Sequence, residues 1–175
     1  MSAPAKTHAE RDVIIKVRGL VNGFGSQLLH DHLDLDVYRG EVLGVVGGSG
    51  TGKSVLMRSI IGLNEIRSGT IEVFGRNTAG MSEAQWREIE QRWGVLFQEG
   101  ALFSSQTIAE NIQVPLREYL NMPQELMNEI ASMKLSMVGL PENAAPKHPS
   151  ELSGGMKKRA GLARALALDP EIVFL

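Results

Sequence analysis

The sequence predicts an α/β fold with an antiparallel β portion at its N-terminal end and a mainly helical segment further along. Three observations predict it. Short β-rich runs alternate with helix-like segments between residues 13 and 97, as in sheets covered by helices. Polar and apolar residues alternate over 33–37, which is typical of a strand with one face in water. Strand signals then stop over 101–149.

Turn residues and one cap separate the predicted elements. Arg39-Gly40 ends the first β portion, and Gly75 follows a later strand. Ser82 and Gln85 form a capping box, which predicts a helix start. The elements predicted up to this point are strands over 13–17 and 33–37, a buried strand over 42–46, a helix over 54–63, a strand over 70–74, a helix from 82 to about 92 and a short buried strand over 95–97.

A helix is predicted between Pro123 and Gly139, because a first-turn proline and a terminal glycine bound this segment. One face of this helix has an apolar stripe. Helical apolar spacing mostly reports burial, so the stripe is interpreted as facing the core. The alternative is a soft surface that a partner covers, since thioether side chains repack easily. The stripe consists of Leu126, Ile130, Met133 and Met137.

Composition limits the function classes. A chain of 175 residues with 43% apolar residues fits one globular domain. A net charge of -2 gives no reason to expect a nucleic-acid partner. The absence of cysteine excludes disulfides, thiolate metal sites and a cysteine nucleophile. No apolar run reaches the ~18 residues of a membrane span. Residues 1–12 are polar and predict a disordered leader without a signal peptide.

Residues 47–54, GGSGTGKS, match the phosphate-loop pattern G-x-x-x-x-G-K-[ST] directly after the predicted buried strand. Glycines let the backbone curl, so that amide donors and the positive end of a helix converge on phosphate oxygens. Lys53 would reach the β- and γ-phosphates, and the Ser54 hydroxyl would bind Mg²⁺. The alternative is a glycine-rich surface turn, but the order strand, loop, helix favours a nucleoside triphosphate site. The loop residues are Gly47, Gly48, Ser49, Gly50, Thr51, Gly52, Lys53 and Ser54.

A second helix N-terminus follows at LSGGM, residues 152–156, before the basic run 157–159. Ser153 is a candidate N-cap, and Gly154 and Gly155 leave the next amides uncovered. The helix is predicted to run to about Leu168. Because the first loop already holds one triphosphate, a second anion site suggests that two copies of the chain share the nucleotide. The alternatives are a capped structural helix with glycines for close packing and a solvated basic face.

The phosphate loop, Gln98 after a short strand and LSGGM together resemble the ATP-binding subunits of ABC transporters over residues 13–175. The segments FQEGALF (97–103), VPLRE (114–118) and SELSGGMKKRAGLARALALDP (150–170) resemble the ATPases of MCE-linked, Mla-type phospholipid transporters of Gram-negative bacteria, which include organic-solvent-tolerance transporters. The resemblance implies a β portion and RecA-like core with Walker A over 13–100. It further implies a helical subdomain over 101–149, and a signature helix with the start of the Walker B strand over 150–175.

The resemblance also implies roles for single residues. Phe24 would stack on adenine, although it could be an ordinary loop aromatic. Gln98 would contact Mg²⁺ and the attacking water, although it could be a polar residue at a strand end. Ser153, Gly154 and Gly155 would close over the γ-phosphate of a nucleotide bound to the opposite subunit.

For the whole protein, the resemblance implies ATP and Mg²⁺ as cofactors and coupling of ATP hydrolysis to transport, here of phospholipid between membranes. The implied partners are a second copy, an integral-membrane permease, an MCE-type substrate-binding protein and a small STAS-like subunit, with no nucleic acid. The implied location is the cytoplasmic face of the inner membrane. The alternatives are an importer ATPase for another solute, a different P-loop enzyme such as a kinase or GTPase, and a non-hydrolysing ATP-binding module.

The last residues, EIVFL (171–175), resemble the beginning of a Walker B strand. In the family this strand ends in an aspartate that holds Mg²⁺ and a glutamate that polarises water. Because the sequence stops before them, we expect a fragment of a longer protein with its C-terminal part missing. These 175 residues would then bind ATP weakly and hydrolyse it poorly.

Overall fold

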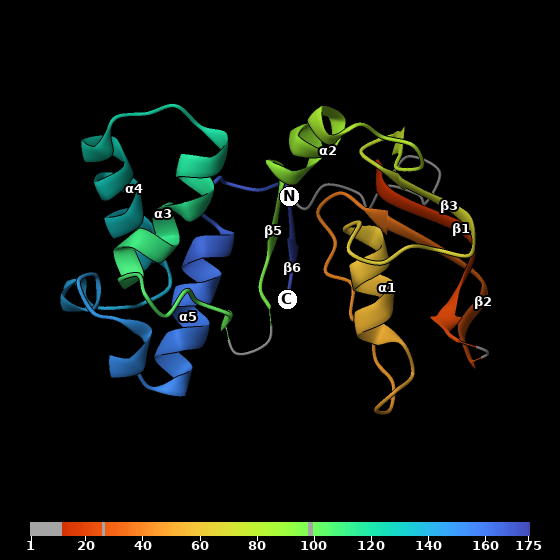
Figure 1. Cartoon of the computed structure of the whole chain (residues 1–175), viewed down its shortest axis with the longest axis horizontal. Coiled ribbons are helices and arrows are strands. Elements are labelled where there is room, and N and C mark those ends of the chain that lie inside the picture. The colour runs from red at the N-terminus through yellow and green to blue at the C-terminus, as the bar shows by residue number, and fades with distance from the viewer. Residues whose placement is uncertain (1–11, 26, 98–99) are drawn as a thin grey trace, which may run out of the picture. The chain divides into compact units, whose positions relative to one another are not determined.

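The computed structural model describes residues 12–25, 27–97 and 100–175 (Figure 1). The chain divides into two compact units, Met1–Trp86 and Arg87–Leu175. Within the described ranges, no helix combines the length and the apolar character that a membrane span requires.

The first unit contains an antiparallel sheet with the strand order β2-β1-β3-β4. Its inward side chains alternate along the strands, so that Ile15, Val17, Ile71 and Val73 are buried. This sheet confirms the predicted antiparallel β portion, and its first strand is longer than the sequence predicts. The strands are β1 (Val13–Phe24), β2 (Gln27–Tyr38), β3 (Ser68–Val73) and β4 (Arg76–Asn77).

Helix α1 (Lys53–Ile60) lies beside this sheet (Figure 1), and its Leu56 and Ile60 are buried. A polar contact joins the two layers, because the buried Asn22 amide of β1 donates to the Ser59 hydroxyl of α1. Ser59 donates in turn to the Val55 carbonyl, 2.9 Å away. The helix begins one residue before the predicted start and ends three residues before the predicted end.

The prediction of a buried strand over 42–46 is wrong for this structure. Residues 41–48 have no regular secondary structure, and Val42 and Val46 are 102% and 91% exposed. An apolar run shows that a segment tends to be buried, but a strand also needs a neighbour for its N–H and C=O groups. Among the described residues, this segment pairs with no strand of its unit.

Helices dominate the second unit, as predicted for 101–149. The predicted capping box is confirmed at α2 (Glu83–Glu90), which begins before this unit: the Ser82 amide donates to Gln85 Oε1 and the Gln85 amide to Ser82 Oγ. The other helices are α3 (Ile108–Tyr119), α4 (Gln124–Met137) and α5 (Gly154–Ala165), with 3-10 turns η3 (Glu142–Ala144) and η4 (Pro149–Glu151).

The core of this unit lies between α3, α4 and α5, which Figure 1 shows gathered side by side. Helix α5 contributes mainly alanines to this core. The buried residues of the three helices include Ile108, Ile112, Leu116, Met127, Ala131, Leu135, Ala160 and Ala163.

The interpretation of the α4 stripe as core-facing is wrong for three of its four members. Leu126, Met133 and Met137 are 44%, 49% and 61% exposed, and only Ile130 packs against the core. The buried face of α4 instead contains Met127, Ala131, Lys134 and Leu135. Helical spacing shows which residues share a face, but α4 has two faces with apolar residues, and packing against α3 and α5 selects one.

Two short strands complete the unit. β5 (Trp93–Val95) and β6 (Ile172–Phe174) pair in parallel, which confirms the predicted strand at the end of the chain. The prediction for 95–97 is displaced by two residues, and Phe97 is 36% exposed. The register explains the shift: Trp93 opposes Ile172, and its ring meets the Phe174 ring edge-on at 5.8 Å.

Candidate nucleotide-binding site

The phosphate loop ends at an uncapped helix N-terminus. Gly52 is the N-cap of α1 with φ 94°, no side chain caps the helix, and its first turn contains no acidic residue. The first backbone N–H groups of a helix have no intrahelical acceptor. They therefore remain available to an anion, and the helix dipole favours one at this end.

Lys53 closes the loop on itself. Its Nζ donates to the Gly47 carbonyl at 2.8 Å and the Gly48 carbonyl at 2.6 Å. The Thr51 hydroxyl donates to the same Gly48 carbonyl at 3.0 Å. The third acceptor of Lys53 Nζ is the Thr51 hydroxyl at 3.5 Å. Because all three acceptors are neutral oxygens, they do not neutralise the ammonium charge, and the loop presents a cation beside free amides.

Only glycine fits at position 52. Its positive φ is a conformation that side chains with a Cβ rarely adopt. A Cβ there would also lie 2.8 Å from Cε1 and Nε2 of His30 and 3.2 Å from Cβ of Leu29. The imidazole of β2 therefore supports the loop directly. Sequence analysis missed His30, because nothing in a strand pattern shows which side chain a distant loop will contact.

The residues present are compatible with Mg²⁺ bound mainly by phosphate. Ser54 is exposed in the first turn of α1, next to Lys53. Over the ranges 12–25, 27–97 and 100–175, no group of three or more His, Asp or Glu side chains is placed to hold a metal. Mg²⁺ commonly takes one or two protein oxygens and completes its shell with phosphate and water, so the Ser54 hydroxyl suits it.

Two predicted contacts cannot be located. Phe24 is the last residue of β1 and pairs with Gln27, but its side chain lies outside the described residues. Gln98 lies wholly outside them. The adenine contact and the contact with Mg²⁺ and water therefore stay predictions.

The second predicted anion site is an N-capped helix start in the other unit. Ser153 caps α5, and its Oγ accepts from the Met156 amide at 3.3 Å. Gly154 and Gly155 are exposed, and a Cβ at either position would meet no atom within 4 Å. Close packing within the described unit therefore does not explain these two glycines. They leave an open tip whose backbone another molecule can approach.

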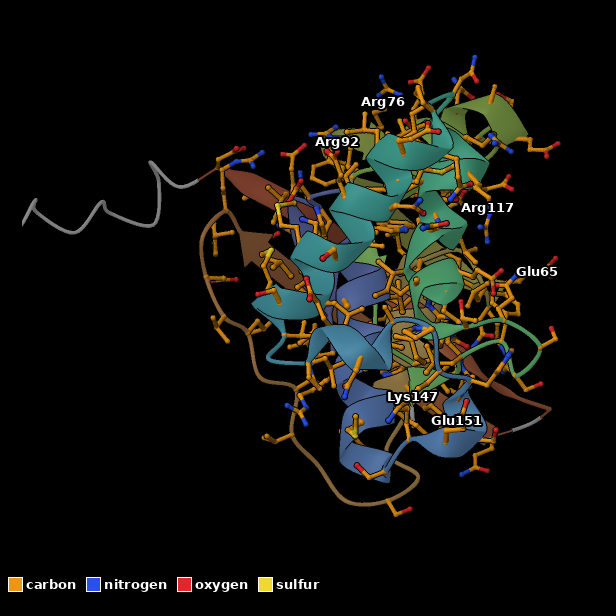
Figure 2. The ribbon with its side chains drawn as sticks, turned by 90° about the vertical axis from the view of Figure 1, so that its left-hand side faces the viewer. Glu65, Arg76, Arg92, Arg117, Lys147 and Glu151 are labelled. Atoms are coloured by element: carbon orange, nitrogen blue, oxygen red, sulfur yellow. The ribbon has the colours of Figure 1, made fainter. Side chains whose placement is uncertain are left out.

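The segment before this tip is anchored to its own unit. Figure 2 shows Lys147 and Glu151 on the segment that leads into α5. The Lys147 carbonyl accepts from the Ile108 amide at 2.8 Å, and a Glu151 carboxylate oxygen accepts from the His148 amide at 2.7 Å. These bonds fix the approach to Ser153.

Arg164 of α5 holds the chain just after Gln98. Its guanidinium donates to the carbonyls of Gly100 at 2.8 Å and Ala101 at 2.9 Å and lies over the Phe103 ring. Burial lowers the pKa of Arg164. A Cβ on Gly161 would lie 2.7 Å from the Gly100 Cα, so the two backbones touch. This contact, which sequence analysis also missed, joins α5 to the segment that follows Gln98.

Comparisons with known proteins agree with this geometry. Residues 30–175 match the family model described as ABC transporter. The chain is 45% identical over 162 residues to the probable ribonucleotide transport ATP-binding protein mkl of Mycobacterium leprae (93% of this chain, 46% of that protein). It is also similar to two intermembrane phospholipid transport system ATP-binding proteins MlaF. The protein of Haemophilus influenzae is 40% identical over 161 residues, which cover 92% of this chain and 61% of that protein. The protein of Escherichia coli K12 is 41% identical over 150 residues, which cover 86% of this chain and 55% of that protein. The chain spans about half the length of these relatives.

Solved structures share the fold. A dimeric, post-hydrolysis structure of the ATP-binding cassette MJ0796 bound to ADP and Pi has a TM-score of 0.83 at 28% identity, covering 91% of this chain and 72% of that one. The cbiO1 protein of Clostridium perfringens has a TM-score of 0.79 at 25% identity, covering 93% and 64%. The predicted fold class and the predicted resemblance are both confirmed, and the chain belongs to the ABC transporter family.

Proposed function

We propose that this chain is the nucleotide-binding part of a transport ATPase and that it binds ATP with Mg²⁺ at residues 47–54. The observation that supports this most directly is the uncapped N-terminus of α1, where free amides lie beside the Lys53 ammonium and the first helical turn contains no acidic residue. The test is calorimetric titration with MgATP. Saturable binding at one site per chain is expected, and absence of binding would contradict the proposal.

The loop would bind phosphate by exchanging partners. Lys53 leaves the Gly47 and Gly48 carbonyls and donates to the β- and γ-phosphate oxygens, while the amides of the loop take the remaining oxygens. Mg²⁺, held through Ser54, would neutralise phosphate charge. Positioning and charge neutralisation supply most of what phosphoryl transfer needs.

The open tip at Ser153, Gly154 and Gly155 would cover the γ-phosphate of a nucleotide bound to a second copy. Its exposed amides and the N-terminus of α5 are suited to an anion from outside the unit. Two copies would thus enclose two ATP molecules, and loss of the γ-phosphate would let the copies separate and drive a permease.

Replacing Ser153 by arginine is expected to leave MgATP affinity unchanged and to abolish ATP-dependent dimerisation, because a bulky cation would block the tip. The measurement is light scattering coupled to size-exclusion chromatography, with the full-length protein under non-hydrolysing conditions. Ser132→Arg is the matched control, since Ser132 is an exposed serine on α4 of the same unit. Dimerisation of the Ser153 variant at wild-type affinity would contradict the shared site.

For the transported substrate, we propose phospholipid moved between membranes. The support is the similarity to the two MlaF proteins, together with the segments 97–103, 114–118 and 150–170. The partners would be an integral-membrane permease, an MCE-type substrate-binding protein and a small STAS-like subunit, and the location would be the cytoplasmic face of the inner membrane.

The name of the mkl relatives favours a second candidate, transport of a ribonucleotide. The two are distinguished by reconstituting the full-length protein with its permease in vesicles. ATP-dependent transfer of a labelled phospholipid supports the first candidate, and uptake of a labelled ribonucleotide without lipid transfer supports the second.

A further inference from the structure

One buried side chain beside the phosphate loop has only a packing role in the site as described so far. His30 lies on β2 and is 7% exposed. Its Cε1 and Nε2 atoms meet the position of a Cβ on Gly52, the residue from which α1 begins. The imidazole, Gly52 and α1 all belong to the first unit.

One ring nitrogen of this imidazole makes no hydrogen bond within the described residues. This nitrogen, Nδ1, is buried. Asn22, which pairs with His30 across β1 and β2, directs its amide to Ser59 instead. An apolar side chain would fill this space without leaving a polar atom unpaired, since such atoms are costly to bury. Packing alone therefore does not account for a histidine here.

Burial favours the neutral ring of His30 in the nucleotide-free chain. The loop brings the Lys53 ammonium, while β1 and α1 contribute the neutral Asn22 and Ser59. On β2 itself, Asp31 and His32 are exposed and pair with each other. In the part of the chain that the structure describes, burial lowers the pKa of His30 from its ordinary 6.5.

We propose that His30 is a positioning residue of the phosphate loop and takes up a proton when nucleotide phosphates occupy that loop. The proposal rests on the nucleotide site proposed above. Phosphates bound at the amides around Gly52 bring negative charge close to the ring. A nearby opposite charge stabilises imidazolium, which is the form that burial disfavours in the free chain. The ring then supplies a second cation behind the loop, in addition to Lys53.

The direction of the pH dependence follows from linkage. If the pKa of His30 is higher in the bound chain than in the free chain, binding is accompanied by proton uptake. Affinity then rises as the pH falls through the bound-state pKa, by at most about tenfold per pH unit for one proton. The stability of the free chain has the opposite pH dependence to the affinity. Because burial lowers the pKa of His30, the free energy of unfolding decreases as the pH falls below 6.5.

Histidine NMR titrations test the proposal directly. The chain contains four histidines, and His30→Gln assigns the His30 ring signal by its loss. The pKa of His30 is expected to rise by about one unit or more when MgADP saturates the chain, in line with a nearby opposite charge. An unchanged His30 pKa in a chain that demonstrably binds MgADP would overturn the proposal.

Affinity measurements give an independent readout that a purely structural role would not produce. The ratio of MgADP affinities of wild type and His30→Leu is expected to increase about tenfold between pH 8 and pH 5.5. Titration of the nucleotide itself affects both proteins equally and cancels in the ratio. His32→Asn is the control, because His32 is exposed and asparagine tolerates the positive φ of that residue. This variant should give a constant affinity ratio. A constant ratio for both His30→Leu and His30→Gln would refute the proton-linked role. If no nucleotide binds at any pH, the proposed function fails instead.

Discussion

Replacing Lys53 by alanine is expected to weaken MgATP binding about 10- to 100-fold and to remove hydrolysis by the full-length protein. A hydrogen bond to a charged group contributes about 1.5–3 kcal/mol, and the contribution grows where charge develops in the transition state. Here the ammonium is already at the loop, bound to neutral carbonyls that it can exchange for phosphate oxygens. Calorimetric affinity and steady-state phosphate release are the measurements.

Arg58→Ala is the matched control for this variant. Arg58 is exposed in the last turn of α1, so its removal deletes one positive charge from the same helix away from the loop. The control should bind MgATP with an affinity close to wild type. Equal losses in both variants would show that net charge matters rather than the position of Lys53, and wild-type affinity of Lys53→Ala would contradict the proposed site.

Asp169→Asn is expected to lower the free energy of unfolding of the second unit by about 2–3 kcal/mol, as expected for losing a hydrogen bond to a buried charged group. The side chain of Lys134 is 1% exposed, and its Nζ lies 2.5 Å from Oδ1 of Asp169, which is 80% exposed. Removing the carboxylate charge leaves a buried ammonium without its counter-ion, which is costly. Asparagine keeps the positive φ of residue 169 without added strain, so the backbone should not contribute.

Lys134→Met should cost less than about 1 kcal/mol, since a well-packed apolar side chain can replace a buried charge. In the double variant, Asp169→Asn should add little further loss. Urea unfolding followed by Trp93 fluorescence in a Trp86→Phe background reports on the second unit, because these are the two tryptophans of the chain. Equal losses of unfolding free energy for Asp169→Asn and Lys134→Met would contradict the expectation that an unpaired buried ammonium costs more than its replacement by an apolar side chain.

Features that depend on neighbouring residues could be predicted from the sequence. The Ser82–Gln85 capping box, the Ser153 cap and the glycine at 139 all appear as expected, because each is decided within one turn of helix. The antiparallel β portion also follows from local alternation. In the same way, the order of glycines, Lys53 and Ser54 was enough to locate the candidate phosphate loop.

Features that depend on distant partners could not be predicted. The apolar residues over 42–46 show a tendency to be buried but do not specify a strand partner. The four residues of the α4 stripe lie on one face of the helix, but packing against α3 and α5 decides which face of α4 is buried. Lys134, His30 and Arg164 act through contacts with residues 35, 22 and 64 positions away along the chain. No periodicity in the sequence reports such contacts.

The open tip at Gly154 and Gly155 has a consequence for how variants of this protein would be scored. Since a Cβ at either position meets nothing in the described unit, alanine should fold there as well as glycine, or slightly better because it favours helix. A thermal-shift screen of the isolated chain would therefore rank these two positions as tolerant. A growth assay that requires the assembled transporter would rank them as intolerant. If the proposed second copy binds this tip, the disagreement between the two rankings would outline its contact surface residue by residue.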